Sequence, residues 1–272
     1  MSKHYTNIIS NLFGKFAKKE FNSNIQNIVN NAYVKMMGLD MSEFDEPKSY
    51  VSLNKLFTRA LNSQRNFEDS DNSFISPSDS LVMECGTLKE HQSMQIKGMS
   101  YHVGAFLGDE IEFDNIKKIE NGEYINLYLS PKDYHRYHAP LDMKISRIVH
   151  IPGKLFPVNK PALKNKKNLF IENERVVLQC HSKENKLFYL VMVGALNVGQ
   201  IVINAQSDLH TNANVKQPTV YDYKDLQIKK GDELGYFMMG STVIVISEKN
   251  MLEINVQVAE NVRFGQKIAT LV

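Results

Sequence analysis

Four consecutive apolar, β-branched residues, Val243 to Ile246, are typical of a strand, and they begin directly after Gly240-Ser241-Thr242. A Gly-Ser bond at such a junction can be a site of self-cleavage, because a deprotonated serine hydroxyl can attack the carbonyl of Gly240 and convert the amide to an ester. β-Elimination from Ser241 then opens the chain and leaves a dehydroalanine, which hydrolyses to a pyruvoyl group. That carbonyl is an electron sink suited to amine chemistry. Gly-Ser-Thr is otherwise an ordinary turn, so this interpretation requires a base and an acid elsewhere.

A candidate base lies in the segment 130–140, where His135 and His138 are flanked by aromatic residues and by two prolines. Histidine is the usual general base near neutral pH. A candidate orienting acid is Asp79, which follows Ser-Pro-Ser. The order Asp79, His138, Ser241 is acceptable, because such triads are defined by geometry and roles. Two other interpretations stay open: His-x-x-His is also a metal-ligand spacing, and Ser-Pro-Ser-Asp also forms Asx turns.

Several further segments occur in a fixed order along the chain: Leu56–Leu61, Ile96–Gly98 with Tyr101 and Leu107–Gly108, Asp133–His138, Pro152–Asn159, Asn173–Val176, Val193–Ala195 with Asn197–Gly199, and Lys230–Phe237. Together with Gly240-Ser241-Thr242, they resemble the bacterial phosphatidylserine decarboxylases, which are pyruvoyl-dependent and self-processing. The resemblance covers most of the chain.

The resemblance implies that Asp79, His138 and Ser241 form the self-processing triad, with cleavage between Gly240 and Ser241. His135 matches the family histidine that is implicated in decarboxylation, as a candidate proton donor. The cofactor would be covalent pyruvate derived from Ser241, which would form a Schiff base with the substrate amine. The implied reaction converts phosphatidylserine to phosphatidylethanolamine and CO2, a carboxy-lyase activity. No separate cofactor-binding or metal-binding residue is expected.

Two positions depart from the family pattern. Met239 precedes Gly-Ser-Thr where leucine, glycine or another residue is usual; a Leu-to-Met exchange is mild, because the volumes are similar. Ser80 follows Asp79 where glycine is usual. If that position needs a positive φ, serine would cost about 1 kcal/mol and could shift Asp79 slightly.

The order of the patterns predicts an α+β fold, with N-terminal amphipathic helices packed on a mainly antiparallel β core. Helical spacing runs from Ile8 to Leu61, and strand patterns dominate after the polar run 66–73. We therefore expect a helical, membrane-associating region at 1–70 and a β-rich catalytic domain at 71–272. Leu252 to Val258 alternates apolar and polar residues, which predicts a strand paired with Val243–Ile246. Leu187–Ala205 favours two buried strands over a membrane span.

The N-terminal helix combines apolar residues with lysines, which suits attachment to an anionic membrane surface and packing on its own domain equally well. The lipid substrate that the resemblance implies favours attachment to the membrane. Its apolar residues are Ile8, Ile9, Leu12, Phe13 and Phe16, and its lysines are Lys3, Lys15, Lys18 and Lys19. With a net charge of +2 over 272 residues, nucleic acid is not an expected partner. Cys85 and Cys180, the two cysteines, fit a reducing compartment, so we expect a peripheral protein on the cytoplasmic face of the cell membrane. The basic tract 160–168 is expected to be a solvated loop.

Cleavage would give chains 1–240 and 241–272, which are expected to stay associated as a heterodimer because the strands of the short chain lie within the sheet. The family resemblance also suggests a homodimer of processed units. Two alternatives remain: a metal-dependent hydrolase with His135 and His138 as ligands, and a non-catalytic lipid-binding homologue that stays full length.

Overall fold

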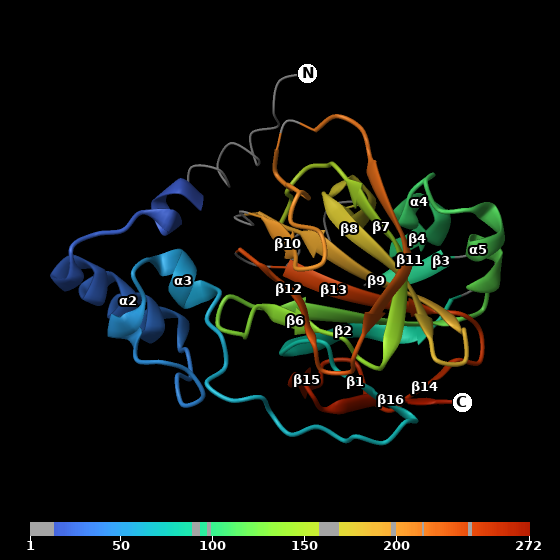
Figure 1. Ribbon diagram of the computed structural model, residues 1–272, viewed down its shortest axis with the longest axis horizontal. Helices are drawn as coiled ribbons and strands as arrows, with labels where there is room; N and C mark the ends of the chain where they lie inside the picture. Colours follow the sequence, from blue (N-terminus) through green and yellow to red (C-terminus); the bar gives the residue numbers. More distant parts are fainter. Residues whose placement is uncertain are drawn as a thin grey trace.

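The computed structural model describes residues 14–88, 93–96, 99–157, 169–196, 200–213, 215–238 and 241–272; the side chains of 93–96, 99–101 and 241 are outside the description. Helices at the N-terminal end precede antiparallel sheets, so the predicted α+β fold is confirmed (Figure 1). Figure 1 shows the N-terminal helices to one side of the β region. The basic tract 160–168 and the first part of the expected amphipathic helix, residues 1–13, lie outside the described residues.

The N-terminal helices are held in place by caps and by a small core. Residues 14–18 are helical and are followed by α2 (Ser23–Met37), the 3-10 helix η1 (Pro47–Ser49) and α3 (Leu53–Phe57). Asn22 caps α2 by accepting the Ile25 N–H at 3.0 Å, and α2 ends at Gly38, whose φ of 66° suits glycine. The six buried apolar residues that hold these helices together are Ala17, Tyr33, Leu39, Leu53, Leu56 and Phe57.

The main sheet of the described chain has eight strands and is antiparallel throughout. Its order is β11 (Thr219–Ile228), β7 (Met143–Ile151), β8 (Arg175–Ser182), β9 (Leu187–Gly194), β13 (Ser241–Ser247), β5 (Glu123–Leu129), β2 (Ser80–Thr87) and β15 (Asn261–Val262). β13 lies between β9 and β5. The side chains of Val243–Ile246 are at most 1% exposed, which explains why this strand is apolar at consecutive positions.

Smaller sheets and helices complete the β region. One sheet has the order β10 (Ile201–Ile203), β12 (Glu233–Phe237), β6 (Arg136–His138), and another has the order β1 (Ser73–Ile75), β16 (Lys267–Leu271), β14 (Leu252–Ile254). β3 (Ser93–Ile96) pairs with β4 (Met99–His102). The helices are α4 (Val103–Leu107), α5 (Phe113–Lys118) and α7 (Leu169–Glu172).

One predicted strand pairing is wrong. β14 pairs with β16 and not with β13, because both edges of β13 are already hydrogen-bonded to β5 and β9. After Ser247 the chain turns, with Asn250 at a φ of 58°, and crosses to the other sheet. The strand also ends at Ile254, earlier than the alternation to Val258 predicts.

The apolar segment 187–205 forms two buried strands, β9 and β10, as predicted. In the described part of the chain, we find no helix with the length and apolar character needed to cross a membrane.

Candidate active site

Ser241 is the first residue of β13, the strand that the apolar run Val243–Ile246 predicts. Its backbone pairs with Leu129 at the end of β5 and with Gly194 at the end of β9. Gly240 and the side chain of Ser241 lie outside the described parts of the chain. The candidate cleavage site therefore adjoins the end of a strand that is held on both sides.

His138 is the last residue of β6 and is held by hydrogen bonds from both ring nitrogens. Its Nδ1 lies 2.9 Å from the carbonyl oxygen of Gly231, and its Nε2 lies 3.0 Å from the hydroxyl of Tyr134. A carbonyl can only accept, so Nδ1 carries the proton and Nε2 has the lone pair. Burial lowers the pKa of His138, and burial raises the pKa of Tyr134. His138 is thus neutral near pH 7, the form that a general base requires.

The ring of His138 lies against an aromatic side chain from the far end of the sequence. The ring of Phe264 stacks on it with a centroid distance of 3.7 Å and an interplanar angle of 14°. Tyr134 stacks at 5.7 Å. His138 is 7% exposed and Phe264 2%, so these contacts hold the imidazole in one orientation away from bulk water.

Asp79 lies beside this aromatic group, but its carboxylate is paired with an arginine. Its Oδ1 accepts from Nη1 of Arg65 at 2.5 Å and from the backbone N–H of Phe264 at 2.8 Å, and its Oδ2 accepts from Nη2 of Arg65 at 3.0 Å. The backbone N–H of His138 donates to Pro77 in the turn before Asp79. The structure therefore brings Asp79 and His138 into one cluster, but no hydrogen bond joins their described side chains directly.

Ser80, which replaces the usual glycine after Asp79, is accommodated without backbone strain. Among the described residues other than glycine, a positive φ occurs only at Asn121, Asn185, Asn212, Asn250 and Ala259. Ser80 has no positive φ, so the cost considered for a serine at this position does not arise. Its hydroxyl lies 3.2 Å from the carbonyl oxygen of Ser78.

His135 is fully buried in the loop between β5 and β6. Its Nδ1 donates to the carbonyl of Asp133 at 2.8 Å, and its ring lies 3.9 Å from that of Phe57 in α3. Burial lowers the pKa of His135 to about 3, so the ring is neutral. Its Nε2 has no hydrogen-bond partner among the described residues. The backbone N–H of Phe237, the last residue of β12, donates to the carbonyl of His135.

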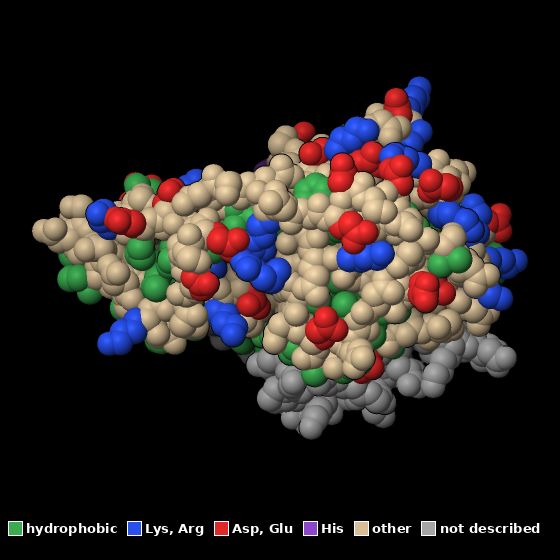
Figure 2. Space-filling view, turned by 90° about the horizontal axis from the view of Figure 1, so that it is seen from below, with side chains coloured by type: hydrophobic (Ala, Val, Ile, Leu, Met, Phe, Trp, Pro, Cys, Tyr) green, Lys and Arg blue, Asp and Glu red, His purple; other side chains and the backbone are tan. Residues whose placement is uncertain are grey.

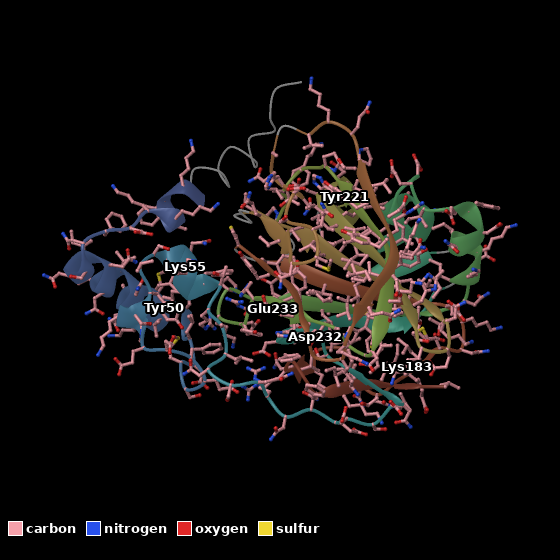
Figure 3. The ribbon with its side chains drawn as sticks, viewed as in Figure 1. Tyr50, Lys55, Lys183, Tyr221, Asp232 and Glu233 are labelled. Carbon is pink, nitrogen blue, oxygen red and sulfur yellow. The ribbon has the colours of Figure 1, made fainter. Side chains whose placement is uncertain are left out.

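The segment after α3 supports the histidine loop from the side of the N-terminal helices. Nη2 of the buried Arg59 donates to the carbonyls of Lys132 and Asp133 at 2.9 and 3.3 Å. Arg136 in turn donates from Nε to the carbonyl of Thr58 and forms an ion pair with Glu233 at 2.8 Å. Glu233 lies on the side of the β region that faces the N-terminal helices (Figure 3). The Leu56–Leu61 segment thus supports, through these hydrogen bonds, the loop that carries both histidines.

Sequence reasoning missed several members of this cluster. Tyr134 lies within the histidine segment, and its hydroxyl was a local signal for a partner of His138. Arg65, Phe264 and the carbonyl of Gly231 are distant in sequence, and no spacing identifies them.

The arrangement bears on the metal-ligand alternative. Within the described side chains, no group of three or more histidine, cysteine, aspartate or glutamate residues is arranged to hold an ion. In the cluster itself, both nitrogens of His138 are engaged in hydrogen bonds, and Nδ1 of His135 donates to a carbonyl.

Comparison with known proteins gives one consistent family. Residues 53–270 match the family model described as phosphatidylserine decarboxylase. A phosphatidylserine decarboxylase proenzyme of Campylobacter jejuni is 45% identical over 265 residues, which is 96% of this chain and 97% of the relative. A proenzyme of the same name from Helicobacter pylori is 41% identical (97% and 96% covered), and one from Nitrosospira multiformis is 36% identical (95% and 91% covered).

Proposed function

Because the chain belongs to the phosphatidylserine decarboxylase family, we propose that it converts phosphatidylserine to phosphatidylethanolamine and CO2 with a pyruvoyl group made by its own cleavage between Gly240 and Ser241. The observation that carries the proposal is the family match over residues 53–270, which includes both histidines and the Gly-Ser junction. Relatives covered over nearly their whole length are named proenzymes, which supports a chain that is processed.

In the self-processing step, His138 removes the hydroxyl proton of Ser241, and the serine oxygen attacks the carbonyl of Gly240. The neutral ring, with its proton on Nδ1 and its lone pair on Nε2, supports this role. Asp79 is the acid of the triad and stabilises the positive charge that develops on the ring. Its present contacts with Arg65 and Phe264 place the carboxylate in the same cluster as the ring. For direct contact, Nδ1 of His138 would have to exchange the carbonyl of Gly231 for this carboxylate.

In the decarboxylation step, His135 delivers the proton that replaces CO2. A pyruvoyl group at position 241 would supply the carbonyl that accepts the electrons released. The neighbourhood fits such a group, because the Nε2 of His135 and the Oγ of Ser130 are buried polar atoms without partners among the described residues. His135 keeps a proton on Nδ1, so Nε2 must take up a second proton before it can donate one. An anionic substrate nearby would favour that uptake.

The N-terminal region would bring the enzyme to its lipid substrate. Large apolar side chains of α2 and the preceding helix are exposed, namely Phe16, Ile25, Ile28 and Met36. Figure 2 shows hydrophobic side chains gathered on this lobe, and Lys15, Lys18 and Lys19 are exposed nearby. These features support peripheral attachment to an anionic surface on the cytoplasmic face of the membrane. The processed chains 1–240 and 241–272 would form a heterodimer, and two such units a homodimer.

The proposal is tested by the intact mass of purified protein under denaturing conditions, for wild type, Ser241→Ala and His138→Ala. The wild type should give two fragments that meet at Gly240, the smaller one lighter than hydrolysis predicts by the mass of ammonia. Both variants should stay full length. A wild type that stays full length and still binds phosphatidylserine vesicles would instead identify a non-catalytic lipid-binding homologue.

A further inference from the structure

Arg65 connects two carboxylates that belong to different parts of the molecule. Besides its two contacts with Asp79, it donates from Nε to Oε1 of Glu43 at 3.0 Å and from Nη2 to Oε2 at 2.8 Å. The exposed fraction of its side chain is 10%, that of Asp79 is 16% and that of Glu43 is 33%, so the pair with Asp79 is the better shielded from water. Forked contacts of a guanidinium with a carboxylate define orientation as well as distance, which lysine cannot reproduce.

The same side chain reaches the proposed base by two routes. Through Asp79 it adjoins the backbone N–H of Phe264, whose ring stacks on His138. Its guanidinium also lies over the ring of Tyr134 at 5.7 Å, and the hydroxyl of Tyr134 contacts Nε2 of His138. A change at Arg65 would therefore act on the acid and on the surroundings of the base together.

The charges around Arg65 show what its loss would do. Among the described residues, Glu43 forms ion pairs with Arg65 and Arg263, whereas Asp79 forms one with Arg65. Without Arg65, the carboxylate of Asp79 would keep its hydrogen bond from the N–H of Phe264, and the negative charge of Glu43 would repel it. A cavity of about 370 Å³ opens beside these residues, so the carboxylate would have room to turn away from His138.

We propose that Arg65 is a positioning residue for self-processing, which holds the carboxylate of Asp79 beside the His138 ring and ties it, through Glu43, to the N-terminal helices. This inference rests on the proposed function. Glu43 lies after α2, on the helical side of the molecule, and Asp79 lies directly before β2. Figure 2 shows basic and acidic side chains next to each other where the helical lobe meets the β region. Arg65 acts through Asp79, whose carboxylate it contacts with both terminal nitrogens.

The test follows freshly synthesised full-length chains from cell-free translation and measures the rate at which they convert to fragments 1–240 and 241–272. Arg65→Gln should slow this conversion on the order of 10²-fold, the loss expected from a misplaced catalytic group. Arg65→Lys keeps the charge without the fork and should slow it roughly tenfold. Arg263→Gln is the matched control, because it removes from Glu43 an exposed guanidinium that forms no ion pair with Asp79 among the described residues; it should stay within about twofold of wild type.

The pH profile of processing separates positioning from a general loss of fold. Burial is the main cause of the low pKa of His138, the hydrogen bond to Gly231 and the charge of Glu233 raise it, and Arg136 and Arg65 lower it. Removal of the Arg65 charge should therefore move the acidic limb of the profile to higher pH in Arg65→Gln, whereas Arg65→Lys should leave it in place. Both variants keep the other titratable or charged side chains near His138, which are Tyr134, Asp79, Arg136 and Glu233.

Each outcome has one meaning. A wild type that forms no fragments refutes the proposed function. A wild type that is processed, with an Arg65→Gln variant that keeps the same rate and profile, refutes only the role of Arg65. If Arg65→Gln fails to fold, as judged by its Tm, Arg65→Lys decides: a slower rate with an unmoved limb supports positioning, and a wild-type rate overturns it.

Discussion

At the scale of residues, the site combines two buried, neutral histidines with different hydrogen bonds. His138 has both nitrogens engaged, and its lone pair is held by a tyrosine hydroxyl. His135 has one nitrogen engaged, and the other has no hydrogen-bond partner among the described residues. Such a difference suits two proton-transfer steps, because a base needs a defined orientation and a proton donor needs access to the reacting atom.

The buried His135 should make the protein less stable in acid. Its pKa is about 3 in the folded chain against 6.5 when exposed, so between these values the unfolded state binds a proton that the folded state does not. The free energy of unfolding therefore falls as the pH drops below 6.5, by up to ~1.4 kcal/mol per pH unit from this group. Above pH 6.5 this effect is absent.

Urea unfolding of the Ser241→Ala chain at several values between pH 7 and pH 4 would measure that slope. Addition of His135→Gln should make the slope shallower, because glutamine does not titrate. His210→Gln, a change at an exposed histidine, is the control and should leave the slope as it is. An equal slope in the His135→Gln chain would contradict the buried, neutral state of this ring.

At the scale of elements, β13 is the strand on which the proposed chemistry depends. It is paired on both sides, and Asn173 supports its neighbour β9 through a hydrogen bond from Nδ2 to the carbonyl of Gly194 at 2.8 Å. Because Gly194 pairs with Ser241, this buried asparagine helps to define where the strand begins. Cleavage before Ser241 would leave these strand pairings in place.

We therefore expect the fragment 241–272 to remain bound to 1–240 after processing. The apolar side chains of Val243–Ile246 are buried, and β16 in the same fragment pairs with β1 from the other fragment. Native gel filtration should give one peak that contains both fragments, and urea should separate them. Elution of the short fragment alone under native conditions would show that the pairing is too weak to hold it.

At the scale of the whole molecule, a helical lobe with exposed apolar side chains adjoins a β region with a large buried core (Figures 1 and 2). The proposed membrane contact lies on the lobe, and the proposed chemistry lies where the lobe meets the β region. Phe57 ends α3 in the lobe, and Arg59 and Arg65 belong to the chain that leads from it to the β region, so this junction is also part of the site.

Membrane attachment is tested by co-sedimentation with vesicles that contain phosphatidylglycerol. Ile28→Asp and Met36→Asp place a charge on the exposed face of α2. Each should lower the affinity for the vesicles roughly tenfold, because the burial of one large apolar side chain in the membrane is lost. Val258→Asp changes an exposed valine of the β region and should bind as wild type does. Self-processing in solution should be unaffected in all three. Unchanged binding of both α2 variants would place the membrane contact elsewhere.

Much of the site was open to prediction because its signals are local. The His-x-x-His spacing, the Gly-Ser junction before β-branched residues and the order of helices and strands are each read within a few residues. The roles of Asp79, His135, His138 and Ser241 remain predictions that follow from family membership. The partner of β14 was predicted wrongly, because an alternating pattern identifies a strand and the face it buries, but not the neighbouring strand.

By itself, the sequence determined the fold class, the family and the chemistry of the groups available, since these depend on residue identity and short-range period. Only the tertiary structure decided which groups meet. Phe264 stacks on His138, Gly231 holds its Nδ1, and Arg65 occupies the carboxylate of Asp79, although these residues come from separate strands, turns and the segment after α3. The physical reason is that such contacts follow from the packing of sheets and lobes, and burial then sets the protonation of the histidines.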